Sequence, residues 1–291
     1  MAKLRLGIPK GSLQESTLRI FKRAGFNVSV SERSYFPKID DEEIEPILLR
    51  AQEISRYVEQ GFLDCGITGE DWIRENSSKV IRVANLIYAK QGLTPVRWVL
   101  AVSENSSIRK VKDLRGKRIA TELVKVTKDF LRKNKVAAKV EFSWGATEAK
   151  VAAGLVDAVV ELTETGSSLK AHNLRSVLTV CESTTQFIAN SRSYRDSWKK
   201  KKICQIATLL VGAVSADNMV GFRMNVQQAR LKKILSILPA LKNPTISHLS
   251  KKDWLAVETV IDEGTVRNLI PRLKEAGAEG IIEYSLNKLV Y

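Results

Sequence analysis

The chain has 291 residues, of which 44% are hydrophobic and 27% charged, a composition typical of globular domains. It carries 47 Lys and Arg against 32 Asp and Glu, and this net charge of +15 indicates polyanionic ligands, either nucleic acid or small phosphorylated substrates. No apolar run is long enough to span a bilayer, so we expect no membrane contact.

Cysteine usage and the N-terminal residues both favour a cytoplasmic protein. The three cysteines, Cys65, Cys181 and Cys204, are odd in number and far apart, which argues against a disulfide framework and a zinc site. The first twelve residues lack the apolar run of a signal peptide. A chain of this length has room for two or three domains.

The basic residues are not accompanied by a nucleic-acid-binding motif. The sequence has no zinc-finger spacing, no RNP-like aromatic motif and no Gly-x-x-Gly clamp, so the charge alone leaves the partner open, although our prediction for the whole chain is no nucleic-acid partner. The densest basic run, WKKKK at 198–202, precedes the apolar stretch ICQIATLLVGAV at 203–214. We interpret it as a solvated turn before a buried strand.

Short apolar segments alternate with helical periodicity in the first part of the chain. Strands are expected at 4–9, 27–30, 46–51, 64–69 and 81–88. Helices are expected at 13–24 and 51–61, where Gly25 and Gly61 supply stop signals. This alternation predicts an α/β layer with a mostly parallel sheet.

A second α/β unit begins near Gly92. Its strands are expected at 96–103, within 110–122, at 138–144 and at 156–163, with a basic helix through Leu131 and another helix from 146. The stretch at 177–190 is again strand-like. A chain that leaves one lobe, builds a second and then returns creates a cleft between them, a preferred place for small ligands.

The pattern changes near residue 213. Strands are expected at 218–226, 244–250, 254–262 and 279–291, and amphipathic helices at 227–241 and 264–278. The order β-α-β-β-α-β is that of a ferredoxin-like module. We therefore expect a separate C-terminal domain.

One segment combines a buried strand with a loop suited to an oxyanion. In VVELTETGSSLK, Val159 to Lys170, two β-branched residues are followed by small hydroxyl residues and a glycine, whose N–H groups can converge on a phosphate. Glu161 and Glu164 lie in the same segment, where a bound phosphate should repel them. The segment alone leaves open why two carboxylates lie beside an anion site.

Several stretches together resemble ATP phosphoribosyltransferase, the family that opens histidine biosynthesis. They are GIPKG at 7–11, LRAQEISRYVEQGFLDCGITGEDW at 49–72, DLRGKRIAT at 113–121, the segment from Val159 to Lys170, and NPTISHL at 243–249. The resemblance covers essentially the whole chain and implies the long form of the family. It implies two lobes like those of type II periplasmic binding proteins, plus a ferredoxin-like, ACT-like regulatory domain. Lobe I would comprise 1–91 and 183–212, lobe II 92–182, and the regulatory domain 213–291.

The same resemblance implies the substrates and their contacts. The substrates would be ATP and 5-phosphoribosyl-1-pyrophosphate, with Mg²⁺ as cofactor and metal ligands that the sequence does not identify. The segment after Val160 would bind phosphoribosyl pyrophosphate: Glu161 for the ribose hydroxyls, and the loop for the 5-phosphate. The residues assigned to this substrate are Glu148, Glu161, Thr163, Glu164, Thr165, Gly166, Ser167, Ser168 and Leu169.

Three further residues match family positions for catalysis, and each also has an ordinary structural explanation. Lys10 suits contact with pyrophosphate but could be a solvated strand end, and Arg50 suits an anion but could be a surface charge. Asp71 could contact substrate or metal, or cap a helix. Glu148 could favour a helix dipole instead. Glu164 could face solvent, Mg²⁺ or ribose, and Ser12 stands where the family often has Arg.

The C-terminal module is expected to regulate the enzyme. The resemblance implies feedback inhibition by L-histidine, with Asn225 and Thr245 contacting the inhibitor from neighbouring edge positions of their strands. It also implies a homo-oligomer with dimer and hexamer forms. His172 and His248 are isolated, and we assign neither a role.

Two other classes of protein remain open at the level of sequence. A non-catalytic ligand-binding protein could use the same two-lobed fold, and a nucleic-acid binder is favoured only by charge. An assay for phosphoribosylated ATP with release of pyrophosphate separates these from the enzyme.

Overall fold

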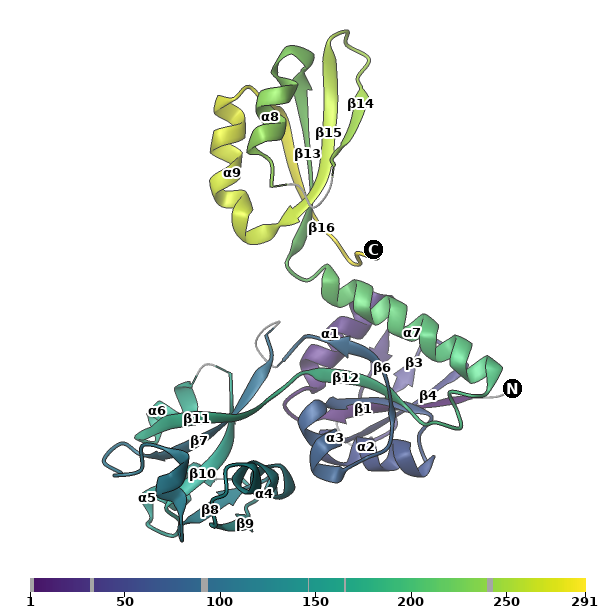
Figure 1. Cartoon of the computed structure of the whole chain (residues 1–291). Coiled ribbons are helices and arrows are strands. Elements are labelled where there is room, and N and C mark those ends of the chain that lie inside the picture. The colour runs from purple at the N-terminus through teal and green to yellow at the C-terminus, as the bar shows by residue number, and fades with distance from the viewer. Residues whose placement is uncertain (1–2, 32–33, 90–93, 146, 165, 240–242) are drawn as a thin grey trace. The chain divides into compact units, whose positions relative to one another are not determined.

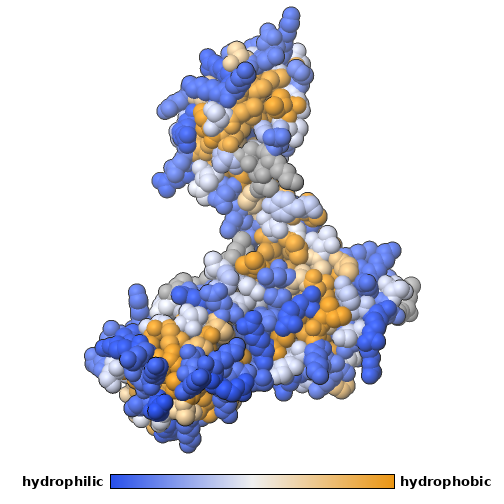
Figure 2. All heavy atoms as spheres, in the orientation of Figure 1, coloured by the Kyte–Doolittle hydropathy of each residue, from blue (hydrophilic) through white to orange (hydrophobic). Residues whose placement is uncertain are grey.

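A computed structural model describes residues 3–31, 34–89, 94–145, 147–164, 166–239 and 243–291. The chain forms two compact units, 1–210 and 211–291, and Figure 1 shows the elements of each. Hydrophilic side chains cover much of the surface in the view of Figure 2, as the charged fraction leads one to expect. None of the helices in the described ranges is long and apolar enough to cross a membrane.

The first sheet of the larger unit defines lobe I. Its strand order is β4 (Ile44–Arg50), β1 (Leu4–Lys10), β5 (Cys65–Gly69), β12 (Thr185–Ala189) and β6 (Ile81–Leu86). The helices of this lobe are α1 (Gln14–Ala24), α2 (Ala51–Gln60) and α3 (Glu70–Asn76). The strands β2 (Val28–Ser29) and β3 (Lys38–Ile39) pair with each other in a separate two-stranded sheet. Strands β4, β1 and β5 are parallel, whereas β12 pairs antiparallel with both neighbours.

The second sheet defines lobe II. Its order is β11 (Leu174–Ser183), β7 (Val96–Ser103), β10 (Ala158–Thr163), β8 (Arg118–Thr121) and β9 (Lys139–Phe142). The 3-10 turn η1 (Val111–Leu114) and the helices α4 (Val124–Lys133), α5 (Thr147–Ala152) and α6 (Ser167–Ala171) complete the lobe. Strands β9, β8 and β10 are parallel, so their carboxyl ends lie at one edge of the sheet.

The strand-like stretch at 177–190 serves both lobes. Its first part belongs to β11 on the edge of the second sheet, and its last part forms β12 inside the first sheet, with Thr184 between them. All five residues of β12 are buried, because strands flank it on both sides. The chain therefore returns to the first sheet here.

The strand predicted at 203–214 is wrong. Residues Ser197–Ser215 form helix α7, and the buried side chains Ile203, Ile206, Ala207 and Leu210 recur at helical spacing. The stretch lacks the alternation of apolar and polar residues that is typical of a strand. Because most of its residues are apolar, the helical spacing of the buried ones is hard to see in the sequence. This spacing was the signal that the interpretation missed.

The basic run before this stretch is not a solvated turn, because it forms the first turns of α7. Lys199 Nζ lies 2.7 Å from Asp64 Oδ1, and Lys202 Nζ lies 2.7 Å from Asp41 Oδ2 and 2.6 Å from Glu43 Oε2. Burial acts to raise the pKa of Asp64, but the hydrogen bonds from Lys199 and Ser193 outweigh it and hold that pKa below its ordinary value. Part of the positive charge is thus used to fix α7 onto lobe I.

The smaller unit has the predicted β-α-β-β-α-β order. Its sheet runs β14 (Thr245–His248), β15 (Trp254–Asp262), β13 (Met219–Gln227) and β16 (Glu279–Ser285), all antiparallel. A 3-10 turn, η2 (Gln228–Arg230), precedes α8 (Leu231–Ile237), which is shorter than the helix expected at 227–241, and α9 is Glu263–Glu275. The core lies between these helices and one face of the sheet. The two-lobed core and the ferredoxin-like module are both confirmed.

Asn225 and Thr245 do not occupy neighbouring edge positions, so that part of the expectation is wrong. Thr245 lies on the edge strand β14, whereas Asn225 lies on the inner strand β13, with β15 between them. The ferredoxin-like order interleaves the strands, and chain order does not reveal this. The register pairs Asn225 with Ala256 and Thr245 with Glu258, which places both on the face away from the helices.

Candidate active site

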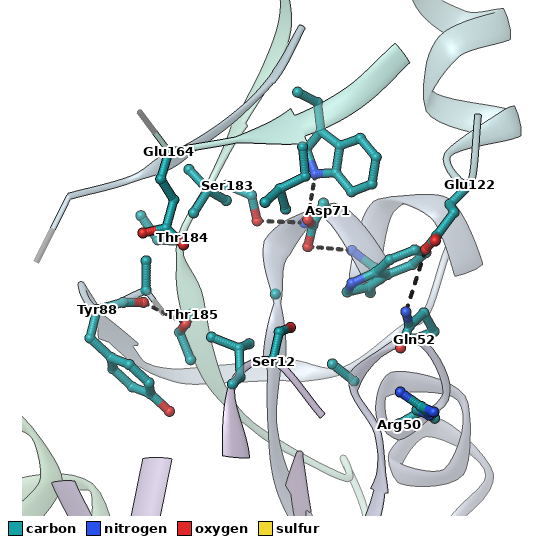
Figure 3. A pocket seen from close by; sticks show the side chains of 18 of the residues that line it. Ser12, Arg50, Gln52, Asp71, Tyr88, Glu122, Glu164, Ser183, Thr184 and Thr185 are labelled. Atoms are coloured by element: carbon teal, nitrogen blue, oxygen red, sulfur yellow. Dashed lines mark hydrogen bonds between the residues drawn. The ribbon is translucent and has the colours of Figure 1, made fainter. Parts of the chain in front are cut away.

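A cleft of about 280 Å³ lies where the carboxyl ends of β1, β4 and β5 of lobe I meet residues of lobe II (Figure 3). Such ends of parallel strands are the usual ligand sites of α/β folds. Of the residues predicted for the site, five line this cleft: Lys10, Arg50, Asp71, Glu161 and Glu164. Ser12 lines it as well.

The cationic side of the cleft is built by two paired strands. Lys10 and Arg50 are register partners at the ends of β1 and β4, so the parallel pairing brings their side chains to the same edge. Gly11 has φ +106°, and a Cβ there would lie 3.0 Å from Arg50 Nη1. The glycine thus permits both the turn and the close approach of the guanidinium. Lys10 Nζ also lies 3.9 Å from the centroid of the Tyr35 ring.

Asp71 joins the two lobes at the floor of the cleft. Its Oδ2 accepts a hydrogen bond from Trp98 Nε1 at 2.6 Å, and its Oδ1 accepts one from the Trp72 backbone N–H at 2.9 Å. Its own N–H donates to Ser183 Oγ at 3.0 Å. Only 3% of Asp71 is exposed, and burial raises the pKa of its carboxyl against these hydrogen bonds.

The sequence interpretation of Asp71 as a helix cap does not describe this geometry. Helix α3 begins at Glu70 with Gly69 as the capping residue, so Asp71 already lies inside the first turn. Its side chain turns back toward Gly69, where a Cβ would clash with Oδ1. The small residue before α3 therefore leaves space for the buried carboxylate.

Carboxylates converge on the lobe II side. Glu161 lies on β10 and lines the cleft. Burial, together with the negative charges of Glu148 and Glu122, raises the pKa of its carboxyl to about 7. Glu122 follows β8 directly, so the parallel strands β8 and β10 deliver their glutamates to the same edge. A ligand with hydroxyl or cationic groups would relieve this repulsion.

A turn at Gly166 connects β10 to α6. Gly166 has φ +82°, and its N–H donates to Thr163 Oγ1 at 2.8 Å, which closes the turn before α6. Ser168 Oγ donates to Glu148 Oε1 at 2.7 Å, so these two predicted residues are neighbours. Leu169 is 4% exposed and packs in the lobe II core, which leaves its backbone as the polar part. Ser167 begins α6, and Thr165 lies outside the described residues.

Several cleft residues were missed in the sequence. Gln52 Nε2 lies 3.4 Å from Glu122 Oε2 across the cleft. Thr185 Oγ1 donates to the Tyr88 carbonyl oxygen at 2.8 Å, and the Tyr88 hydroxyl lies 2.7 Å from Thr17 Oγ1. Glu122 could have been found, because a carboxylate directly after a parallel strand carries the same signal as Glu161. The others come together only through the lobe packing.

No cluster of three or more His, Cys, Asp or Glu suited to a metal ion occurs in the described part of the chain. Magnesium needs no such cluster, because it commonly binds one or two carboxylates together with substrate phosphates. The crowded glutamates around Glu161 offer hard oxygen donors of that kind. The residues therefore fit a magnesium ion carried by a phosphorylated substrate.

These features define a two-lobed α/β protein with a mixed-charge cleft and an appended ferredoxin-like unit. Residues 50–212 match the family model of ATP phosphoribosyltransferase, and residues 216–288 match that of the HisG C-terminal domain. The chain belongs to the ATP phosphoribosyltransferase family, and it is an enzyme, a pentosyltransferase of histidine biosynthesis.

Relatives and a solved structure agree with this assignment. The chain is 60% identical to ATP phosphoribosyltransferase of Solibacter usitatus over 287 residues, covering 99% of both chains. It is 58% identical to that of Thermodesulfovibrio yellowstonii, covering 99% of this chain and 98% of the relative. It also resembles a chain of the ATP phosphoribosyl transferase (HisG:HisZ) complex of Thermotoga maritima, with 27% identity and a TM-score of 0.61 over 71% of this chain and 95% of that one.

Proposed function

We propose that the chain transfers the 5-phosphoribosyl group of 5-phosphoribosyl-1-pyrophosphate to N1 of the adenine of ATP. The adenine nitrogen forms a bond to ribose C1, the bond from C1 to the pyrophosphate oxygen breaks, and that electron pair leaves with pyrophosphate. The products are pyrophosphate and 1-(5-phosphoribosyl)-ATP. Since no covalent intermediate is needed, the protein mainly aligns two anionic substrates and stabilises the leaving group.

The observation that carries this proposal is the division of charge across the cleft. Lobe I supplies Lys10 and Arg50, while lobe II supplies Glu122, Glu161 and Glu164. The segment that ends in Ser168 follows Glu164 directly in the chain. Phosphoribosyl pyrophosphate has the matching layout, with a pyrophosphate at one end, hydroxyls in the middle and a phosphate at the other end. A single ligand of this kind would place its pyrophosphate against the cationic side of the cleft and its hydroxyls against the acidic side.

We assign the contacts accordingly. Lys10 and Arg50 receive the pyrophosphate, and Glu161 accepts hydrogen bonds from the ribose hydroxyls. The loop of Thr163, Thr165, Gly166, Ser167, Ser168 and Leu169 holds the 5-phosphate through hydroxyl and N–H groups. This requires Ser168 to exchange its hydrogen bond with Glu148 for one with the phosphate. Asp71 belongs to the site through its place at the cleft floor.

Mg²⁺ is proposed as the cofactor, with Glu164 as its candidate protein ligand beside the substrate phosphates. When bound with the pyrophosphate, it would neutralise negative charge and so improve the leaving group. Glu164 lines the cleft.

The experiment that tests the proposal incubates the purified chain with ATP, phosphoribosyl pyrophosphate and magnesium. A phosphoribosylated ATP product and pyrophosphate should form in equal amounts. Ligand binding without either product would instead support a non-catalytic protein of the same fold. Replacement of ATP by GTP is the control, because the proposed nucleophile is the adenine N1.

We further propose that free L-histidine binds the C-terminal domain and inhibits the enzyme, in a cytoplasmic homo-oligomer with dimer and hexamer forms. The βαββαβ unit is separate from the residues that build the cleft, which suits regulation. Asn225 and Thr245 share the face of its sheet that the helices leave open. Contacts from that face would need a coupling free energy of only about 1–3 kcal/mol to the cleft.

The substitution Thr245→Val is expected to weaken inhibition by histidine at least fivefold and leave the uninhibited rate unchanged. The reason is that valine keeps the shape of threonine but loses its hydroxyl, and the exposed edge strand tolerates the change. Histidine is titrated against the initial rate for the parent, for Thr245→Val and for Ser247→Ala on the same strand. Equal sensitivity of Thr245→Val and the parent would remove this contact, and a parent indifferent to millimolar histidine would remove the regulatory role.

A further inference from the structure

Helix α3 of lobe I caps a helix of lobe II. Both carboxylate oxygens of Glu75 accept backbone hydrogen bonds from the first turn of α4: Oε1 from Lys125 N and Oε2 from Val126 N, each at 2.9 Å. The N–H groups of a first helical turn have no partner within their own helix, and a carboxylate there also favours the helix dipole. Glu75 therefore supplies to α4 a cap that its own lobe does not, since Leu123 makes no side-chain cap there.

The residue after Glu75 extends this contact back to the cleft. Asn76 Nδ2 donates to the Gln52 carbonyl oxygen at 2.7 Å and to Ser55 Oγ at 2.9 Å, which ties the end of α3 to α2. The Gln52 side chain in turn reaches Glu122 Oε2 at 3.4 Å. Glu122 lies two residues before α4, in a turn at 121–123 where the Leu123 N–H donates to Thr121 Oγ1 at 3.0 Å.

These contacts form a closed circuit through both lobes. It runs from Gln52 through Asn76 and Glu75 to α4, then through Glu122 back to Gln52. Gln52 and Glu122 both line the cleft, and Glu122 lies beside Glu161. The cap at Glu75 and the contact of Glu122 with Gln52 are therefore connected through the first turn of α4 and the turn at 121–123.

We propose that Glu75 is a positioning residue that sets Glu122 in the cleft by capping α4 across the lobe boundary. This deepens the proposed function and rests on it for its catalytic consequence. Glu75 itself does not touch substrate. Its two hydrogen bonds fix the start of α4. Because the turn at 121–123 is short, the fixed start of α4 also restrains where the Glu122 carboxylate lies.

Two variants separate the cap from general structural support. In Glu75→Gln the amide can accept with one oxygen only, and its NH₂ group meets a backbone donor, so the cap is lost at constant size. Glu59→Gln is the matched control, because Glu59 Oε1 accepts the Lys79 backbone N–H at 3.0 Å within lobe I alone.

The first measurement is amide hydrogen exchange, which does not depend on turnover. In Glu75→Gln, exchange at Lys125 and Val126 should accelerate at least tenfold, and the faster exchange should extend to Glu122 and Leu123. Glu59→Gln should leave these amides unchanged. Unchanged exchange at Lys125 and Val126 in Glu75→Gln would overturn the cap, and acceleration that stops before Glu122 would overturn the link.

The second measurement is a double-mutant cycle on the affinity for phosphoribosyl pyrophosphate, by calorimetry. Glu75→Gln should weaken binding about fivefold, and in the Glu122→Gln background it should weaken binding less than twofold further, because the residue through which it acts is already altered. Additive losses, with a native melting temperature, would overturn the positioning role. A parent that binds no phosphoribosyl pyrophosphate contradicts the proposed function instead, and the exchange measurement then still decides the cap.

Discussion

Glu161→Gln is expected to lower kcat/KM for phosphoribosyl pyrophosphate by roughly ten- to a hundredfold, the equivalent of about 1.5–3 kcal/mol for a charge-assisted hydrogen bond. Glu161 lies near the end of β10 and lines the cleft. In the proposed function its carboxylate accepts hydrogen bonds from the ribose hydroxyls and faces the positive charge that develops on the ribose. Steady-state kinetics at saturating ATP measure the loss. Glu141→Gln is the matched control, because Glu141 lies on β9, the edge strand of the same sheet, where its carboxylate pairs with Arg118.

The pH dependence of the parent should identify the same group. Since the pKa of Glu161 is raised to about 7, its ionised form is lost as the pH falls through that value. The efficiency should then decline by about tenfold per pH unit on the acid side. A phosphate group of the substrate also titrates near about pH 6, so Glu161→Gln should keep only this later decline. An identical acid limb in parent and variant would contradict the assignment.

The free energy of unfolding should fall as the pH rises, whereas the catalytic efficiency should rise. The folded chain keeps the Glu161 proton up to about pH 7, whereas the unfolded chain releases it near the ordinary value of 4.5. The unfolded state therefore binds fewer protons in this window, and stability falls as the pH rises from about 4.5 to about 7. Glutamine has no such charge, so the variant should melt higher than the parent at pH 8 and equally near pH 4. A variant that melts several degrees lower at pH 8 would show that the carboxylate supports the fold.

Ser168→Asp is expected to weaken binding of phosphoribosyl pyrophosphate by at least tenfold. The new carboxylate would stand beside Glu148, which Ser168 now contacts, and would repel the 5-phosphate where a hydroxyl should receive it. Ser167→Asp, one residue earlier in the loop, should act in the same direction. Calorimetry with phosphoribosyl pyrophosphate measures the affinity of each variant.

The control for added charge is Ser176→Asp, on the exposed part of the edge strand β11 of the same lobe. It should bind the substrate like the parent. Full affinity in both loop variants would move the phosphate site away from this loop. An equal loss in Ser176→Asp would show that net charge, rather than position, is responsible.

Much of the site could be predicted from sequence because its residues follow strands directly. Lys10 ends β1, Arg50 ends β4 and Glu161 lies near the end of β10, and in α/β folds the carboxyl ends of parallel strands share one edge. The strand periodicity, the glycine stops and the β-α-β-β-α-β order depend on neighbours in the chain. Such local signals predicted both lobes and the C-terminal module, whereas the domain boundaries and the ligand contacts stay predictions.

Other features required the tertiary structure. The chain at 203–214 is a helix because its buried apolar side chains recur at intervals of three and four, although the stretch is apolar apart from Gln205 and Thr208. Sequence order placed Asn225 and Thr245 side by side, and the interleaved sheet separates them by a strand.

By itself, then, the sequence determined the order of the elements, the charged and polar groups at their ends, and the family to which these belong, since all of these rest on residues close together in the chain. Only the tertiary structure decided which distant groups meet. Asp71 reaches Trp98 across 27 positions, and Glu75 reaches Val126 across 51. Hydrogen bonds of this kind depend on how the two lobes pack. That packing is set by the burial of apolar side chains on the faces of both sheets, which no local pattern in the chain specifies.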